Sequence, residues 1–402
     1  MSRFNHYFLM KEPDVIAYIR EKLDFFDAGA PLECHEIGDG NLNYVFRVKD
    51  SRSGKSIIVK QAGEHLRISE EMTLTTDRGR IEAGILTLQG HLCPGLVPHV
   101  YLYDGVMCAM VMEDMIHHTM MRTGLLHHET YPLFADQITN FLVRSLLLTS
   151  DVVMDHQERK KLVCKFINPE LCDITENLVF GEPVLDYNHR NDVYAPMADF
   201  VKKEIYEDEA LKAEIARLKF DFMNHAQSLI HGDLHSGSIF VNQEGTKVID
   251  PEFAFYGPMG YDIGNVIGNL FFAWANKYYT DSENTEFLTW IEKTIGEVTD
   301  KFKEKFSAKW DALVEFPLYR TEGFKKYYTD KVMADSFGYA GTEIIRRVVG
   351  DSKVKEVTSV TNVDQRVPME RALIQIGIKL IKERRTLKDG AAIKAVGKEY
   401  LK

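Results

Sequence analysis

The stretch that decides the fold is His231–Gly264, HGDLHSGSIFVNQEGTKVIDPEFAFYGPMGYDIG. Asp233 comes directly after an apolar segment, and two short strand-like runs separate it from Asp250 and Glu252. In extended chain, side chains two residues apart point to the same face, so both later carboxylates can reach one cation. Pro251 between them stiffens that geometry by fixing its own φ. The stretch therefore predicts a pair of carboxylates suited to a metal ion, preceded in the chain by a loop aspartate.

This order of carboxylates resembles the catalytic and metal-binding loops of the protein-kinase-like fold. There a loop aspartate accepts the proton of the acceptor hydroxyl, and a later carboxylate holds Mg²⁺ on the phosphates of ATP. The resemblance implies that Asp233 is the catalytic base and that Asp250 and Glu252 bind the metal. Ser238 stands where such loops usually carry an asparagine ligand, and we expect Glu252 to supply the lost ligand. An aspartate beside a glycine is also common in turns, so a structural role for Asp233 stays open.

Composition narrows the possible partners and compartments. A net charge of −11 argues against a nucleic-acid binder and against an anionic membrane surface, because both require a basic patch. The 45% hydrophobic and 27% charged residues are typical of a soluble globular protein. The five cysteines lack zinc-finger spacing, and neither a signal-peptide core nor an 18-residue apolar run occurs in the sequence. We therefore expect a cytoplasmic enzyme with reduced thiols.

Periodicity divides the chain into a β-rich first third and a mainly helical remainder, which predicts an α+β, two-lobe, protein-kinase-like fold. We expect an N-terminal nucleotide-binding lobe at 1–112, a hinge at 113–115, and a C-terminal catalytic and substrate-binding lobe at 116–402. The expected strands and hairpins are 37–48, 55–61, 100–112 and 238–249. The expected helices are 80–88, 134–145, 210–230, 261–274, 283–299, 340–349 and 364–382.

The first hairpin is the candidate phosphate-covering loop. In kinase-like proteins its glycines let the backbone approach the phosphates closely. The residues of this loop that we expect to contact ATP are Gly38, Gly40, Asn41 and Asn43. A DG turn between two strands is more often ordinary hairpin chemistry, so the loop alone is a weak signal.

Lys60, late in the following strand, is the candidate for contact with the α- and β-phosphates. A lysine after an apolar run is often a solvated edge residue, but its place between the glycine turn and a helix favours the functional role. We expect Glu82 to pair with it, and Glu70 and Glu71 are rival partners. The hinge, Glu113 to Met115, is expected to meet adenine through backbone groups, with ATP between the lobes.

Four segments resemble one narrower family, the 5-methylthioribose kinases of methionine salvage. These segments are HGDLHSGS (231–238), DPEFAFYGPMGYDIGN (250–265), IGDGNLNYVF (37–46) and GTEIIRRVVG (341–350). The resemblance implies transfer of the ATP γ-phosphoryl group to the anomeric O1 of 5-methylthioribose, a Mg²⁺ requirement and a homodimer.

The resemblance also implies that Arg346 and Arg347 help bind the sugar and the transferring phosphoryl group. A guanidinium there would offset charge on the phosphoryl oxygens and offer a planar fork to hydroxyls. Adjacent residues on a helix point about 100° apart. It therefore stays open whether both face the site or one is an ion-paired surface arginine.

Two rival functions remain at this point. One is a kinase for another small hydroxylated acceptor, such as an aminoglycoside, choline, homoserine or a fructosamine. The other is a nucleotide-binding scaffold without turnover, which the presence of Lys60, Asp233 and Asp250 disfavours.

Overall fold

The computed structural model describes residues 2–37, 43–63, 65–66, 69–283 and 285–402, with only the backbone at 65–66 and 69–73. The described residues form two compact units, Met1–His118 with Lys247–Phe253, and Thr119–Thr246 with Ala254–Lys402. The α+β prediction is confirmed, since the first unit contains an antiparallel sheet and the second is mainly helical. The first segment ends near the predicted hinge. Residues 247–253, which the sequence assigned to the C-terminal lobe, group instead with the first unit.

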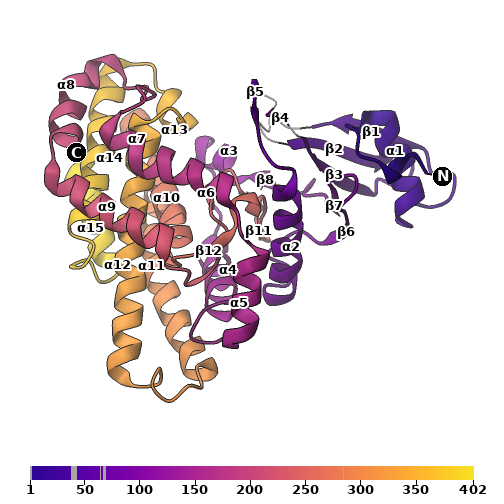
Figure 1. The fold of residues 1–402 in the computed structure, drawn as a ribbon. Coiled ribbons are helices and arrows are strands. Elements are labelled where there is room, and N and C mark those ends of the chain that lie inside the picture. Colours follow the sequence, from indigo (N-terminus) through magenta and orange to yellow (C-terminus); the bar gives the residue numbers. More distant parts are fainter. Residues whose placement is uncertain (1, 38–42, 64, 67–68, 284) are drawn as a thin grey trace. The chain divides into compact units, whose positions relative to one another are not determined.

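The first unit is built on an antiparallel sheet, five-stranded within the described residues, in the order β1-β2-β3-β7-β6 (Figure 1). Its strands are β1 (Leu32–Glu36), β2 (Asn43–Asp50), β3 (Ser56–Ala62), β6 (Val100–Asp104) and β7 (Ala109–Glu113). The predicted strand at 55–61 and the hairpin at 100–112 are confirmed. β4 (His65–Leu66) and β5 (Ser69–Thr73) pair separately. In the register of the sheet Lys60 lies opposite Val45 on β2 and Met110 on β7, so its strand is an interior one.

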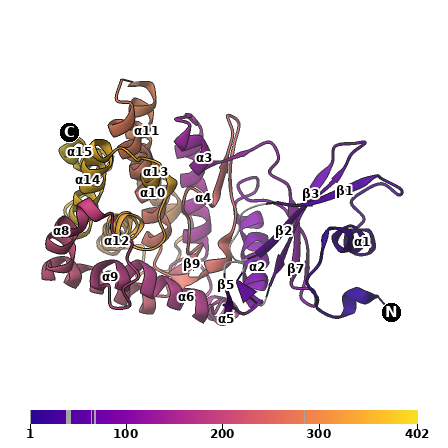
Figure 2. The same cartoon turned by 90° about the horizontal axis from the view of Figure 1, so that it is seen from above.

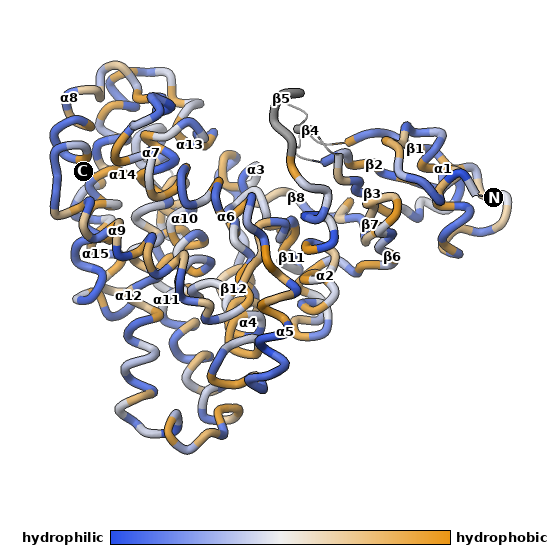
Figure 3. The backbone as a smooth tube through the Cα atoms, viewed as in Figure 1, coloured by the Kyte–Doolittle hydropathy of each residue, from blue (hydrophilic) through white to orange (hydrophobic). Residues whose placement is uncertain are grey.

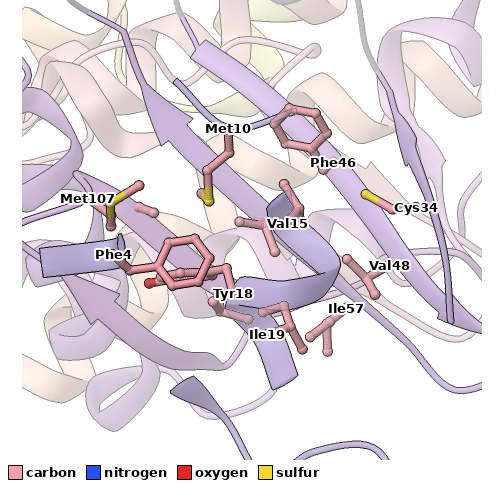
Figure 4. Close-up of a cluster of buried hydrophobic side chains, with 13 residues drawn as sticks. Phe4, Met10, Val15, Tyr18, Ile19, Cys34, Phe46, Val48, Ile57 and Met107 are labelled. Carbon is pink, nitrogen blue, oxygen red and sulfur yellow. The ribbon is translucent and has the colours of Figure 1, made fainter. Parts of the chain in front are cut away.

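Two helices complete this unit, and only one of them is expected from the sequence. α2 (Asp77–Leu92) contains the predicted helix at 80–88, whereas α1 (Glu12–Lys22) was read as strand and turn. Its signals are Pro13 in the first turn, an Asp14 carboxylate that accepts from the Lys11 N–H, and apolar residues at i, i+3 and i+4. These apolar residues enter a cluster with Phe46 and Val48 of β2 (Figure 4). Burial of this shared face holds α1 on the sheet.

The second unit is a helical assembly in which α10 (Gly260–Thr280), α12 (Glu322–Val349) and α14 (Val363–Lys382) pack side by side (Figures 1 and 2). All three contain helices predicted from periodicity, and so does α4 (Phe134–Leu148). The predicted helix at 283–299 overlaps α11 (Thr285–Leu313), which begins later and runs further. The apolar face of α4 is fully buried, as its run of hydrophobic residues indicates (Figure 3). The remaining helices are α3 (Met121–Leu126), α5 (His156–Lys165), α6 (Pro169–Thr175), α7 (Glu182–Leu185), α8 (Ala198–Val201), α9 (Glu209–Asn224), α13 (Lys355–Thr358) and α15 (Gly390–Tyr400).

The expected helix at 210–230 is wrong at its C-terminal end. α9 stops at Asn224, and β9 (Ser228–Ile230) pairs antiparallel with β12 (Phe255–Gly257). The short apolar run before His231 fits the periodicity of a helix and that of a strand. In the structure it pairs with β12 and forms a strand. The predicted strand-like region at 238–249 contains β10 (Ile239–Val241), which pairs with β8 (Thr119–Met120), and then β11 (Thr246–Val248). Among the described residues, no helix has the length and apolar character needed to cross a bilayer.

Close contact between α10 and α12 depends on a glycine. A Cβ placed on Gly264 of α10 would lie 2.5 Å from the Ser336 carbonyl oxygen and 2.7 Å from the Ala340 nitrogen of α12. Both are backbone atoms of a packed helix, so neither can turn aside as a side chain could. The approach brings α10 and α12 together, and both helices carry residues of the candidate site.

Gly264→Ala should therefore lower the free energy of unfolding by about 1–3 kcal/mol through overpacking. Gly323→Ala is the matched control, because it lies in the first turn of α12 and a Cβ added there would meet no described atom within 4 Å. The control should be neutral or stabilising by up to about 1 kcal/mol. Chemical denaturation midpoints of both variants test this, and equal midpoints would show that the helices separate freely.

Candidate active site

The predicted site residues fall into two clusters, one in each unit. The first unit carries Lys60, Asp250 and Glu252, and the second carries Asp233 with the two arginines. Gly38, Gly40 and Asn41 of the predicted phosphate loop lie outside the described residues.

In the first unit Lys60 is held between two carboxylates. Its Nζ lies 2.8 Å from Glu82 Oε1 on α2 and 2.5 Å from Asp250 Oδ1. The expected Lys60–Glu82 pair is thus confirmed, while the side chains of Glu70 and Glu71 lie outside the described part. Burial alone would lower the pKa of Lys60, but Asp250 and Glu82 raise it above its usual value. The ammonium therefore stays charged at neutral pH.

The expectation that Asp250 and Glu252 lie in extended chain is wrong. Asp250 has φ 61°, in the left-handed region, and Pro251–Phe253 form a 3₁₀ turn, η5. The φ that proline fixes suits the start of a helical turn as well as extended chain, which explains the error. A non-glycine residue in the left-handed region is uncommon and stores strain, as often occurs at functional sites. The turn packs against α2, so both carboxylates still reach the cluster around Lys60.

Glu252 is buried and held by neighbours from β2 and α2. Its Oε2 accepts a hydrogen bond of 2.8 Å from Asn43 Nδ2 and lies 3.7 Å from Arg78 Nε. Arg78 Nε in turn donates to Asn43 Oδ1 at 3.2 Å. Asn43, predicted as a nucleotide contact, therefore uses its side chain to position Glu252. Sequence reasoning missed Arg78, although a cation in the first turn of an apolar helix is a signal that it has a buried partner.

The charges of this cluster favour a hard cation. Burial raises the pKa of Glu82 and of Glu252, and repulsion from Asp250 adds to both shifts. Three carboxylates thus share two cationic side chains, Lys60 and Arg78. Mg²⁺ is usually held by one or two carboxylates together with phosphate oxygens and water. No set of three or more His, Cys, Asp or Glu side chains arranged for a metal occurs in the described residues. The pair Asp250 and Glu252 fits this shared mode of Mg²⁺ binding.

The hinge residues are placed at the end of β7. The Glu113 carboxylate binds Lys247 Nζ, with both oxygens at 2.7 Å, and its N–H donates to the His99 carbonyl at 2.8 Å. Met115 is buried. The side chain and the backbone N–H of Glu113 therefore already have partners within the first unit. Contact of residues 113–115 with adenine stays a prediction.

In the second unit, Asp262 fixes the loop that carries Asp233. Its carboxylate accepts from the backbone N–H groups of His231 at 2.7 Å and Gly232 at 3.0 Å. Asn269, two turns further along α10, accepts from the Ser236 N–H at 3.2 Å. Sequence reasoning missed both anchors. The available signal was an aspartate and two asparagines on the apolar face of a predicted helix, where buried polar groups need partners.

Asp233 is surrounded by two guanidiniums and an imidazole. Arg346 Nη2 lies 3.3 Å and Arg347 Nη2 3.9 Å from its Oδ1, and His235 Nε2 lies 3.4 Å from its Oδ2. Burial alone would raise the pKa of Asp233, but His235, Arg346 and Arg347 hold it well below its usual range. Asp233 is therefore ionised throughout the physiological pH range.

Both arginines face this cluster, so the alternative of one surface arginine is wrong. Arg346 and Arg347 are each 8% exposed, and Glu343 accepts from the Nε of both. The glutamate precedes them by three and four residues, spacings that share one helix face. Long side chains thus converge on one acceptor although their Cβ atoms diverge. Sequence reasoning missed Glu343, whose signal was its spacing from the arginine pair. Its pKa, which burial alone would raise, is lowered by the two guanidiniums.

A cavity of about 710 Å³ in the second unit lies elsewhere. It is lined by residues of α9, α12 and the chain after α14, such as Phe220, Asp221 and Lys331. None of the predicted site residues lines it.

Comparison with known proteins identifies the family of this chain. Residues 33–289 match the phosphotransferase enzyme family. Methylthioribose kinase of Geobacillus sp. (strain WCH70) is 38% identical over 93% of this chain and 92% of its own length. Methylthioribose kinase of Bacillus velezensis is 40% identical over 92% of each chain. Among solved structures, choline kinase from Cryptosporidium parvum covers 92% of this chain and 98% of its own, with a TM-score of 0.48 and 13% identity. On the strength of the sequence relatives, the chain belongs to the methylthioribose kinases within the phosphotransferase enzyme family.

Proposed function

We propose that this chain transfers the γ-phosphoryl group of ATP to O1 of 5-methylthioribose, giving 5-methylthioribose 1-phosphate and ADP. Membership of the methylthioribose kinases supports the substrate. The observation that carries the proposal is the ionised Asp233 carboxylate beside two buried guanidiniums. That combination suits a hydroxyl acceptor and a phosphoryl group at the same place.

On the acceptor side, Asp233 orients the O1 hydroxyl by accepting its hydrogen bond. With its pKa held low, the carboxylate is a weak base. It therefore takes the proton only as charge develops on O1, which a loose phosphoryl-transfer transition state allows. Arg346 and Arg347 offset negative charge on the phosphoryl oxygens. Because Glu343 fixes both guanidiniums beforehand, little reorganisation is needed during the reaction.

On the nucleotide side, Lys60 binds the α- and β-phosphates while Glu82 holds its ammonium in place. Asp250 and Glu252 would hold Mg²⁺, which supplies charge neutralisation at the phosphates when bound. Asn43 and Arg78 keep Glu252 in position for that role. The backbone of residues 113–115 is proposed to meet adenine, and the loop with Gly38, Gly40 and Asn41 to cover the phosphates.

A homodimer and a cytoplasmic location also belong to this proposal. Both rest on the family resemblance and on composition, and both remain predictions.

The first test is phosphorylation of methylthioribose with Mg·ATP, followed by phosphorus NMR of the product. We expect phosphate on C1, and no product from choline or an aminoglycoside. Asp233→Asn should lower kcat by about 10²-fold or more, the usual scale for a positioned acid–base group. Its ATP affinity and melting temperature should stay near wild type. Phosphate on another carbon would refute the proposed reaction, and a variant with normal kcat would remove Asp233 from the mechanism.

The second test concerns the metal. Glu252→Gln should raise the Mg²⁺ concentration that gives half-maximal rate, because a carboxylate ligand becomes an amide. Asp250→Asn should do more harm, since we assign it as the primary ligand. Glu158→Gln, an exposed carboxylate on α5, is the matched control and should leave the titration unchanged. Unaltered Mg²⁺ dependence in Glu252→Gln would show that Glu252 does not replace the missing asparagine ligand.

The third test concerns the arginines. Arg346→Ala and Arg347→Ala should lower kcat/KM for methylthioribose by about 10²-fold, the scale for loss of one donor to a developing negative charge. ATP affinity should change far less. Arg385→Ala, an arginine with a 62% exposed side chain in the same unit, controls for loss of charge. A fall in kcat places the guanidinium at the transition state. If both variants keep full kcat/KM, the arginines are structural.

A further inference from the structure

Glu356 on α13 is a buried carboxylate with unsatisfied hydrogen-bonding capacity. The residue is 1% exposed, yet neither carboxylate oxygen has a hydrogen-bond partner in the described part of the chain. Burial raises its pKa, and the guanidiniums of Arg122 and Arg347 only partly offset that effect. A buried carboxylate without hydrogen-bond partners is costly and rare in native proteins.

The position of Glu356 is fixed through its backbone. Asn276 of α10 donates from Nδ2 to the Glu356 carbonyl oxygen at 2.7 Å, and α13 packs on α10. The same helix carries Asp262 and Asn269, which hold the Asp233 loop. One helix thus places Glu356 and Asp233 within the same unit.

Arg122 on α3 completes the arrangement. Its Nη2 lies 3.3 Å from His235 Nδ1, and its N–H donates to the Ser236 carbonyl at 3.0 Å, so it contacts the Asp233 loop. Its buried Nε also has no hydrogen-bond partner among the described residues. Arg122 and Glu356 influence each other electrostatically but do not approach to ion-pair distance. The guanidinium of Arg122 is therefore held against the Asp233 loop with its Nε unsatisfied, and the unsatisfied Glu356 carboxylate acts on it electrostatically.

We propose that Glu356 and Arg122 bind the ring hydroxyls of the sugar acceptor that do not react. A hydroxyl both donates and accepts, so one sugar hydroxyl can donate to Glu356 while it or its neighbour accepts from Arg122 Nε. Vicinal hydroxyls of a pentose offer this combination, whereas a quaternary ammonium group such as that of choline offers no donor. The inference rests on the proposed function and adds the groups that select a polyhydroxylated ring.

The test is a substitution cycle between Glu356→Gln and deoxygenated substrates. Wild-type enzyme should lose roughly 10- to 100-fold in kcat/KM with 2-deoxy- or 3-deoxymethylthioribose, whichever lacks the bound hydroxyl, because hydrogen bonds to charged groups are strong. In Glu356→Gln the penalty for that same analogue should shrink by about tenfold. Arg122→Lys provides a second variant of the same cycle, so the inference stays testable if one variant fails to fold.

Glu370→Gln is the matched control. Glu370 is also 1% exposed and has a raised pKa, caused first by burial, but it is paired with Arg366 at 2.7 Å on α14. The control should keep the wild-type deoxy penalties. Equal penalties in wild type, Glu356→Gln and Arg122→Lys would overturn the inference, and would mean that water satisfies these groups. Failure of the wild type to phosphorylate methylthioribose at all would defeat the proposed function itself, a distinct result.

Discussion

The double ion pair of Glu343 with Arg346 and Arg347 is the interaction on which the cluster around Asp233 depends. Two adjacent guanidiniums in a buried helix cost several kcal/mol unless they are paired. One glutamate at i−3 and i−4 compensates both and fixes their direction. It does not neutralise them fully, because one negative charge faces two positive charges. The excess positive charge adds to the effect of His235 in lowering the pKa of Asp233 below its usual range.

Support for this arrangement comes from α10. Asp262 and Asn269 reach the Asp233 loop, Asn269 also donates to Glu343 at 3.1 Å, and Gly264 between them admits the backbone of α12. The helix therefore links the loop, the arginine pair and, through Asn276, the segment that bears Glu356. Three polar residues of this largely apolar helix, Asp262, Asn269 and Asn276, make these links. Each forms hydrogen bonds to backbone groups or to a charged side chain. Buried polar networks of this kind specify one arrangement because a partly satisfied alternative is costly.

Sequence reasoning identified most helices because their apolar periodicity is long and regular, as in α10, α12 and α14. It also placed Lys60 with Glu82, since the order of strand and helix limits the possible partners. It failed at two short segments that suit more than one conformation. The first is 226–230, which was expected to be helical. The second is the turn at Asp250 to Phe253, where no residue pattern predicts the left-handed φ of Asp250. It missed Glu343 and Asp262 because their roles depend on which helix faces which, a tertiary fact. Both arginine side chains point to the same side because they share the acceptor Glu343, which helix geometry alone does not predict.

The two clusters place carboxylates in different electrostatic environments. In the second unit, Arg346 and Arg347 face Asp233, and Glu343 is the carboxylate that they share with it, so Asp233 stays ionised. In the first unit, Glu82, Asp250 and Glu252 outnumber Lys60 and Arg78, and the pKa values of the two glutamates rise. A carboxylate cluster with a deficit of positive charge binds a proton or a cation, and a divalent ion relieves more repulsion than one proton does. This contrast supports the proposed roles, in which the second cluster binds the phosphoryl group and its acceptor and the first binds metal-bound nucleotide.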